Sequence, residues 1–183
     1  FVGNRKFMNL KAGGGFFTPE ELNKVMGVPE KLLEKRKIEK RKIQKQHFQP
    51  LLRCSKSAFD EQDLLELNHG NIAVCFGRDY HQPGKNPQLC LAPPAIRMFD
   101  RILSVDPHGG AWGLGLLVAE KTLDPEAWYF NCHFKDDFCL PGTLVSEGAI
   151  QLLSFYLLYL GLQTRTNNAT LQPLTNITQS GLN

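Results

Sequence analysis

The pattern of apolar residues divides this chain of 183 residues into a sparse first part and a denser remainder. Residues 31–45 form a predicted helix whose apolar positions are too few for a core-facing stripe, so we expect it to be solvated. An earlier helix start is predicted at Thr18, the expected N-cap, with Pro19 at the first helical position. Residues 1–17 are rich in glycine and are predicted to form a loop or tail.

From Ala58 onward the pattern is that of a folded domain. Residues 59–67 are predicted to form a short amphipathic helix with Asp60 as its cap. Residues 70–94 are rich in Gly, Pro and Asn, which indicates a long irregular segment.

A strand over 97–106, a turn over 107–110 and a returning strand over 111–121 are predicted next. Bulky and small residues alternate in the second strand, which favours a sheet that packs closely around another element. That element is predicted to be the helix 143–160, which is apolar nearly all round and therefore central. The predicted fold class is α+β.

Composition and charge refine this picture. The chain is 42% hydrophobic and 21% charged, as expected for a globular domain with an extension. Residues 1–47 hold 12 basic and 5 acidic side chains, whereas residues 48–183 are acidic overall. The basic helix 31–45 lacks aromatic residues for base stacking and an apolar face for a membrane. We therefore predict a charged linker or docking helix and no nucleic-acid partner. Binding of this basic helix to an acidic partner, such as a carrier domain, is the alternative.

The cysteines, the longest apolar stretch and the first residues indicate where in the cell the protein is located. Five cysteines without a CxxC pair argue against a disulfide framework and against a zinc site. The apolar stretch 148–162 contains Gln151 and is shorter than the ~20 residues that span a bilayer. Residues 1–10 lack the features of a signal peptide, so a cytoplasmic location is predicted.

Candidate chemistry is concentrated between Cys132 and Gly161. An unperturbed histidine has a pKa of ~6.5, so His133 could act as a base near neutral pH. From its immediate neighbours alone, a histidine packed in the core is the simpler interpretation. Glu147 changes this judgement, because a carboxylate in an otherwise apolar helix needs a partner or a function.

Two further residues complete the candidate site. Gln151 lies one helical turn after Glu147 and is predicted to orient it through a hydrogen bond. After Pro141, Gly142 permits close backbone approach, so an N–H group at the helix start could stabilise a developing oxyanion. Such stabilisation is often worth ~3–4 kcal/mol. A base, an acid and an oxyanion donor are what a carbonyl-activated elimination requires.

These residues carry a resemblance to a known family. The sequence CHFKDDFCLPGTLVSEGAIQ, followed by FYLLYLG, resembles the bacterial β-hydroxydecanoyl-acyl carrier protein dehydratase/isomerase family. It is closest to the dehydratase domains of polyunsaturated fatty acid synthases and polyketide megasynthases. The resemblance covers roughly residues 58–183 and implies the hotdog fold, a curved antiparallel sheet around a long central helix, with its C-terminal strands apparently missing. Residues 1–57 are predicted to be a basic helical extension or linker.

The resemblance implies dehydration of a 3-hydroxyacyl thioester to the trans-2-enoyl thioester. His133 matches the catalytic histidine, and Glu147 matches the acid contributed by the second hotdog of a pair. Gly142 matches the glycine whose N–H receives the thioester carbonyl, and Gln151 matches a polar residue near the acid. Cys132 and Phe134 flank the histidine and are predicted to contact substrate. The dehydratase/isomerase branch has Asp where this chain has Glu, so isomerisation remains open.

The implied partners are an acyl carrier protein domain and a second hotdog, either in a homodimer or in tandem. We predict no metal and no dissociable cofactor, because the substrate would be carried on phosphopantetheine and the sequence lacks ligand clusters and phosphate loops. The alternative is a catalytically silent hotdog that scaffolds a synthase or binds acyl chains. Thioester hydrolysis is a third, weaker possibility.

Overall fold

The computed structural model describes residues 18–24, 48–82, 89–110, 112–133, 138–165 and 169–171. The predictions for residues 1–17 and for the basic helix 31–45 lie outside the described residues. The chain divides into two compact units, residues 1–41 with Asn183 and residues 42–182. Residues 48–57 therefore lie in the larger unit, while the roles assigned to 1–57 and 58–183 remain predictions.

The smaller unit contains helix α1 (Pro19–Lys24). Its predicted cap is confirmed, because the Thr18 hydroxyl oxygen accepts a hydrogen bond from the Glu21 N–H (3.2 Å). The Glu21 carboxylate in turn accepts from the Thr18 N–H (2.8 Å), which completes a capping box. These hydrogen bonds lower the pKa of Glu21.

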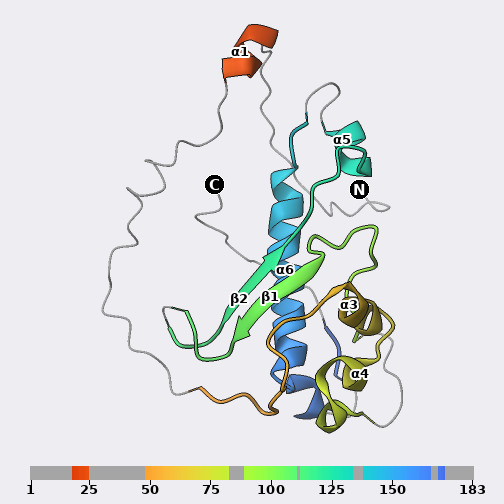
Figure 1. Ribbon diagram of the computed structural model, residues 1–183, viewed down its shortest axis with the longest axis vertical. Helices are drawn as coiled ribbons and strands as arrows, with labels where there is room; N and C mark the ends of the chain where they lie inside the picture. Colours follow the sequence, from red (N-terminus) through yellow and green to blue (C-terminus); the bar gives the residue numbers. More distant parts are fainter. Residues whose placement is uncertain are drawn as a thin grey trace, which may run out of the picture. The chain divides into compact units, whose positions relative to one another are not determined.

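The described residues of the larger unit combine helices with an antiparallel hairpin (Figure 1). In chain order its elements are α3 (Glu61–Asn68), α4 (Ile72–Phe76), the short helix η1 (Arg78–Tyr80), β1 (Arg101–Asp106), β2 (Leu116–Glu120), α5 (Trp128–Cys132), α6 (Gly142–Tyr159) and the short helix η2 (Leu162–Arg165). The α+β class is confirmed.

Helix α3 confirms the predicted amphipathic helix and its cap. The Asp60 carboxylate accepts from the Asp63 N–H (3.0 Å), and Asp63 accepts from the Asp60 N–H (3.2 Å). Leu64 and Leu67 on the inner face are fully buried. The prediction of an irregular segment over 70–94 is wrong in part, because α4 and η1 form there. Their apolar residues recur at helical spacing and are buried: Ile72, Cys75, Phe76 and Tyr80.

The hairpin is shorter than predicted and its connection is longer. Ile102 pairs with Ala119 and Val105 with Leu117, and the strands end at Asp106 and begin again at Leu116. Gly115 explains the long connection: it has a φ of +131°, and a Cβ there would lie 2.2 Å from the Tyr156 hydroxyl oxygen. That hydroxyl donates to the Leu114 carbonyl (2.7 Å), so the loop is bound to α6 and cannot continue the strand.

The two faces of β2 differ as the alternation predicted. Leu117 and Ala119 pack against the core. Leu116 and Val118, on the opposite face, are 50% and 41% exposed. The smaller face of the strand is thus turned inward and the bulkier face outward.

An aromatic cluster lies at the centre of the larger unit. Phe59, Phe76 and Phe155 pack with edge-to-face geometry, at centroid distances of 5.1 to 5.5 Å. Pairs of this kind contribute ~0.5–1.5 kcal/mol beyond their burial. The Tyr80 hydroxyl donates to the Tyr159 carbonyl oxygen (2.7 Å), which joins η1 to the end of α6.

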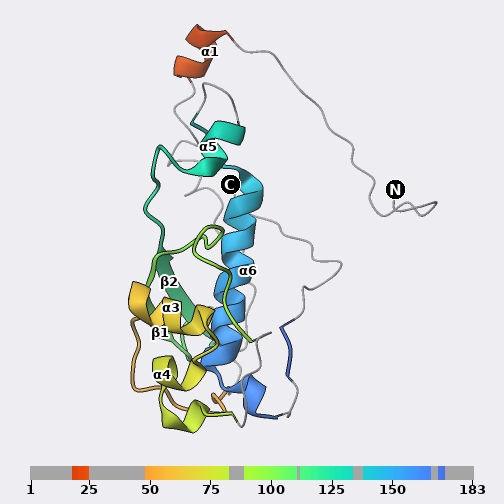
Figure 2. The same ribbon diagram turned by 90° about the vertical axis from the view of Figure 1, so that its right-hand side faces the viewer.

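Helix α6 confirms the predicted long helix, but it is not enclosed on all sides. Phe155 and Leu158 are buried, whereas Val145 and Leu153 are 44% and 43% exposed. In Figure 2, α3, α4 and the hairpin all lie on the same side of α6. Among the described residues, the prediction of a central helix therefore holds for one side of α6 only, because a two-stranded sheet is too narrow to cover both sides. No helix in the described part of the chain could cross a membrane.

Candidate active site

The start of α6 supplies an accessible helix N-terminus. The helix begins at Gly142, and the preceding Pro141 accepts the Leu144 N–H with its carbonyl (2.9 Å) but makes no side-chain cap. Gly142 is exposed, and a Cβ added there would meet nothing within 4 Å. An incoming carbonyl oxygen could therefore approach the first N–H groups, where the helix dipole favours negative charge.

Glu147 lies in the second turn of α6 and is held by Gln151. The Gln151 Nε2 group donates to Glu147 Oε1 at 2.9 Å, so the hydrogen bond expected between them is present. Gln151 is only 5% exposed and is itself fixed by backbone groups. Its Nε2 also donates to the Ile96 carbonyl (3.0 Å), and its Oε1 accepts from the Met98 N–H (2.8 Å). The carboxylate position is therefore coupled to the backbone of residues 96–98.

Close packing of α6 against residues 96–98 allows Gln151 to form these hydrogen bonds. Gly148 faces Met98, and a Cβ at Gly148 would lie 3.1 Å from the Met98 Cβ. The missing side chain lets α6 approach the 96–98 backbone, and Gln151 then spans the remaining distance. The 95–98 segment is itself fixed by a turn in which the Pro93 carbonyl accepts the Ile96 and Arg97 N–H groups (both 3.0 Å).

His133 follows α5 and is half-buried. Its Nδ1 lies 3.4 Å from the Cys139 carbonyl oxygen, three residues before Gly142. When Nδ1 carries the proton in this hydrogen bond, Nε2 is the basic nitrogen of the neutral imidazole. The structure thus places His133 beside the segment that leads into α6, and both Figures 1 and 2 show α5 at the end of the unit where α6 begins.

Aromatic side chains of α5 fix its position. Tyr129 and Phe130 are buried, and the Trp128 indole N–H donates to the Ala95 carbonyl (2.9 Å). Phe138 packs against Phe130 with centroids 5.7 Å apart, yet it is 73% exposed. Helices α5 and α6 are therefore both anchored to the segment 95–98, the first through Ala95 and the second through Ile96 and Met98.

Of the remaining predicted residues, Cys132 is exposed at the end of α5, and Phe134 lies outside the described residues. Sequence reasoning missed the 95–98 segment, including Arg97, which is 4% exposed. Arg97 Nε donates to the Phe99 carbonyl (3.1 Å), while its Nη1 has no hydrogen-bond partner within the described ranges. Burial lowers the Arg97 pKa, against the opposing charges of Glu61 and Asp100. The double proline 93–94 was the available signal for an ordered turn.

An ion pair joins Asp100 and Lys121, the residues just before β1 and just after β2. The Asp100 carboxylate accepts from Lys121 Nζ (2.7 Å) and from the Thr122 N–H (2.8 Å). Burial acts to raise the Asp100 pKa, but these hydrogen bonds and the Lys121 charge outweigh it, and the pKa is lowered. Among the residues that the structure describes, no group of three or more His, Cys, Asp or Glu side chains could hold a metal ion.

Comparison with known proteins shows what this chain is similar to. Residues 91–180 match the family model of the FabA-like domain, a stretch that includes the candidate site. This segment of the chain is therefore similar to the FabA-like domain family. Over most of its length the chain is also similar to a polyunsaturated fatty acid synthase subunit from Thraustochytrium sp. (strain ATCC 26185 / S-3). The two are 35% identical over 178 residues, which cover 95% of this chain and 12% of the relative.

Both comparisons confirm the resemblance predicted from the sequence. The chain spans only 12% of the length of this relative.

Proposed function

We propose that this chain is a dehydratase domain that removes water from a 3-hydroxyacyl thioester and forms the trans-2-enoyl thioester. The observation that carries the proposal is the placement of Glu147 one turn inside the helix whose uncapped start is Gly142, with Gln151 holding its carboxylate. An acid and an oxyanion donor thereby share one rigid element. The family match and the name of the relative support fatty acid or polyunsaturated fatty acid synthesis as the context.

The local geometry supports the roles proposed for the start of α6 and for His133. The backbone N–H of Gly142, at the start of α6, donates a hydrogen bond to the carbonyl oxygen of the substrate thioester. This hydrogen bond stabilises the negative charge that develops on that oxygen. His133, with Nδ1 directed at the Cys139 carbonyl, removes a proton from Cα through Nε2. Cys132, beside it, and Phe134 complete the proposed substrate contacts.

Glu147 in its protonated form then gives a proton to the departing β-hydroxyl group. The Cβ–O bond breaks as the Cα–Cβ double bond forms, and water leaves. His133 ends the step protonated and Glu147 ionised, so one proton must return from His133 to Glu147, through water, before the next turnover. The reaction changes no net oxidation state, and the acid and base are side chains, so we propose that no dissociable cofactor takes part.

The proposed fold is the hotdog of this family, and we propose that a second hotdog completes the site, so that His133 of one acts with Glu147 of the other. Two observations support a second hotdog. The bulky face of β2 is exposed at Leu116 and Val118, and α6 exposes Val145 and Leu153. Exposed apolar residues of this kind are often found where a partner binds. The substrate would arrive on the phosphopantetheine of an acyl carrier protein, and dehydration without isomerisation is proposed because the acid is Glu.

The test is turnover of a 3-hydroxyacyl thioester by the full 183-residue chain, followed as 2-enoyl product. Replacing His133 by Ala, or Glu147 by Gln, is expected to lower kcat about 10²–10⁴-fold, the usual contribution of a general acid or base. His108→Ala and Glu126→Gln are matched controls, because both side chains are exposed and lie outside the site. Equal turnover by wild type and both site variants would refute the proposed roles. Binding of the acyl thioester without turnover by wild type would favour the silent scaffold.

A further inference from the structure

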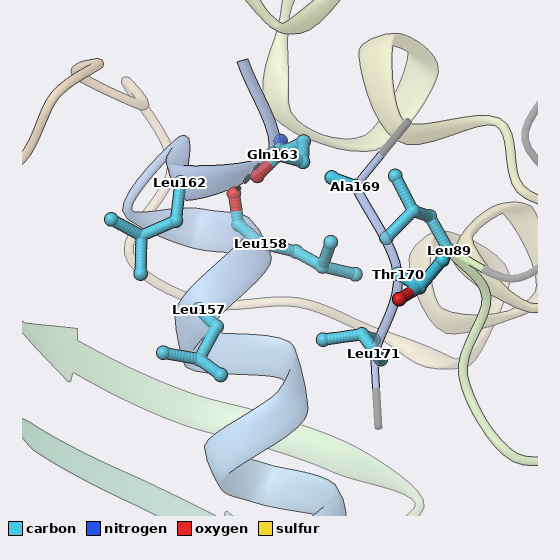
Figure 3. A pocket seen from close by; sticks show the side chains of 8 residues that line it. All are labelled: Leu89, Leu157, Leu158, Leu162, Gln163, Ala169, Thr170 and Leu171. Carbon is cyan, nitrogen blue, oxygen red and sulfur yellow. Dashed lines mark hydrogen bonds between the residues drawn. The ribbon is translucent and has the colours of Figure 1, made fainter. Parts of the chain in front are cut away.

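A cavity of about 380 Å³ lies at the opposite end of α6 from Gly142. Figure 3 shows the side chains on its walls, which come from the end of α6, from η2 and from two segments facing them: Leu157, Leu158, Leu162, Leu89, Ala169 and Leu171. Small-molecule sites usually have volumes of ~300–1,000 Å³. The cavity is therefore large enough for a small ligand, and its walls are mainly aliphatic.

One polar side chain in this wall has an unused acceptor. Gln163 lines the cavity and is 3% exposed. Its Nε2 donates to the Leu158 carbonyl oxygen (3.2 Å), whereas its Oε1 is buried without a hydrogen-bond partner in the described part of the chain. A carbonyl can only accept, so the amide NH₂ must face Leu158. The group left over is therefore a hydrogen-bond acceptor.

The position of this acceptor is fixed by its surroundings. The Gln163 backbone carbonyl accepts from the Gln82 side chain (2.5 Å), and the Thr164 N–H donates to the Gly161 carbonyl (3.0 Å). Gly161 has a φ of +78°, and a Cβ there would lie 2.8 Å from Leu52. Two hydrogen bonds and the close contact with Leu52 thus fix the turn after α6. A buried polar group in such a fixed position is normally paired.

We propose that this cavity binds a small aliphatic molecule that carries one O–H or N–H donor, such as a medium-length alcohol or amide. The donor pairs with Gln163 Oε1, and the aliphatic part packs against Leu157, Leu162 and Leu171. A hydrocarbon would leave the acceptor unpaired. A carboxylate would face an acceptor with no cation among the lining residues. The proposal is independent of the dehydratase function, because none of the residues proposed for that chemistry lines the cavity.

The experiment is a titration of the full chain, with methyl-labelled Leu and Ala, followed by NMR. The probes are 1-hexanol and its isomer pentyl methyl ether, which contain the same atoms but differ in the O–H donor. We expect saturable shifts at Leu162, Ala169 and Leu171 and at least fivefold tighter binding of the alcohol. Absence of saturable shifts with 1-hexanol would overturn the site. Equal binding of the two isomers would overturn the role of the acceptor.

Two variants test separately the contribution of the Gln163 acceptor and that of the cavity volume to binding. Gln163→Met keeps the length of the side chain but removes the acceptor, so 1-hexanol should bind only as tightly as the ether, with the ether unchanged. Ala169→Phe should fill the cavity and abolish both. Gln62→Met, at an exposed glutamine of α3, is the control and should alter neither affinity. A preference for the alcohol that persists in Gln163→Met would refute the assignment. If that variant does not fold, the comparison of 1-hexanol with pentyl methyl ether on the wild-type protein still tests the role of the acceptor.

Discussion

The two ends of α6 are built from different interactions. Its second half is held by Phe155, which is buried among aromatic rings, and by Leu158, which is also almost completely buried. Its first half exposes Gly142 and Val145, and the nearest anchor is Gln151, at the middle of the helix, whose side chain binds backbone groups of another segment. The comparison teaches that stability is concentrated at one end and the candidate chemistry at the other. An open helix start can remain uncapped because the far end supplies the packing.

The largest expected effect tests the stable end. Phe155→Ala should destabilise the fold by about 3–5 kcal/mol, because it removes a buried ring and leaves a cavity. Leu153→Ala, two residues earlier in α6 but 43% exposed, should cost much less, about 0.5–1 kcal/mol. Chemical denaturation measures both. Similar losses would show that the exposed face of α6 is covered in solution.

A pair of glycine substitutions sharpens the comparison next. Gly115→Ala should destabilise by about 2–3 kcal/mol, because its φ is +131° and the new Cβ would clash with Tyr156. Gly142→Ala should leave stability nearly unchanged, since the space around it is open. It should nevertheless lower turnover by about tenfold or more, because the methyl group would occupy the approach of the substrate carbonyl.

Thermal unfolding and the thioester assay, run on both glycine variants, check this pair. Full activity in Gly142→Ala would remove the helix start from the proposed mechanism. A stable Gly115→Ala variant would show that the 107–115 loop can move away from α6.

Removing the anchor of Glu147 should have an intermediate effect. Gln151→Met would break the bonds to Glu147, Ile96 and Met98, at a cost of about 1–3 kcal/mol for the buried groups left unpaired. Turnover should also fall, because the acid is no longer oriented. Gln62→Met is the matched control, since Gln62 also donates to a glutamate one helical turn away, but at an exposed site. Denaturation and kcat measurements on both variants check the prediction, and equal effects would contradict it.

The smallest expected effect concerns pH and the Asp100–Lys121 pair beside the site. The Asp100 pKa is lowered in the folded state, so its contribution to stability is complete above the unfolded pKa of ~3.9. The contribution is lost as pH falls through the lower folded pKa. Asp100→Asn should therefore lower stability at pH 7 and have less effect near pH 3. Unfolding free energies at both values check this, with Asp79→Asn, at an exposed site, as the control. A loss that is the same at both pH values would contradict it.

The features that sequence reasoning predicted are local ones. Thr18 and Asp60 cap helices through residues three positions away, and Gly142 begins α6 directly after Pro141. The Gln151–Glu147 hydrogen bond follows from helical spacing.

The features that it missed depend on contacts between distant segments. The loop before β2 is set by Tyr156, 41 positions after Gly115, and nothing near Gly115 reveals that contact. The anchoring of α5 and α6 on Ala95 and Ile96 likewise joins residues more than 30 positions apart. The exposed face of α6 could not be predicted, because apolar composition does not say how much of a helix its own chain covers.

The turn after Pro93 binds Trp128 through Ala95 and Gln151 through Ile96, at neighbouring carbonyl groups. A shift of this turn would carry both helices in the same direction. The spacing between the histidine that follows one helix and the carboxylate on the other would then change less than the location of either. Because the proposed acid–base pair takes one side chain from each of two hotdogs, a change in this turn would shift the His133 of one site and the Glu147 of the other together, and so alter both sites at once.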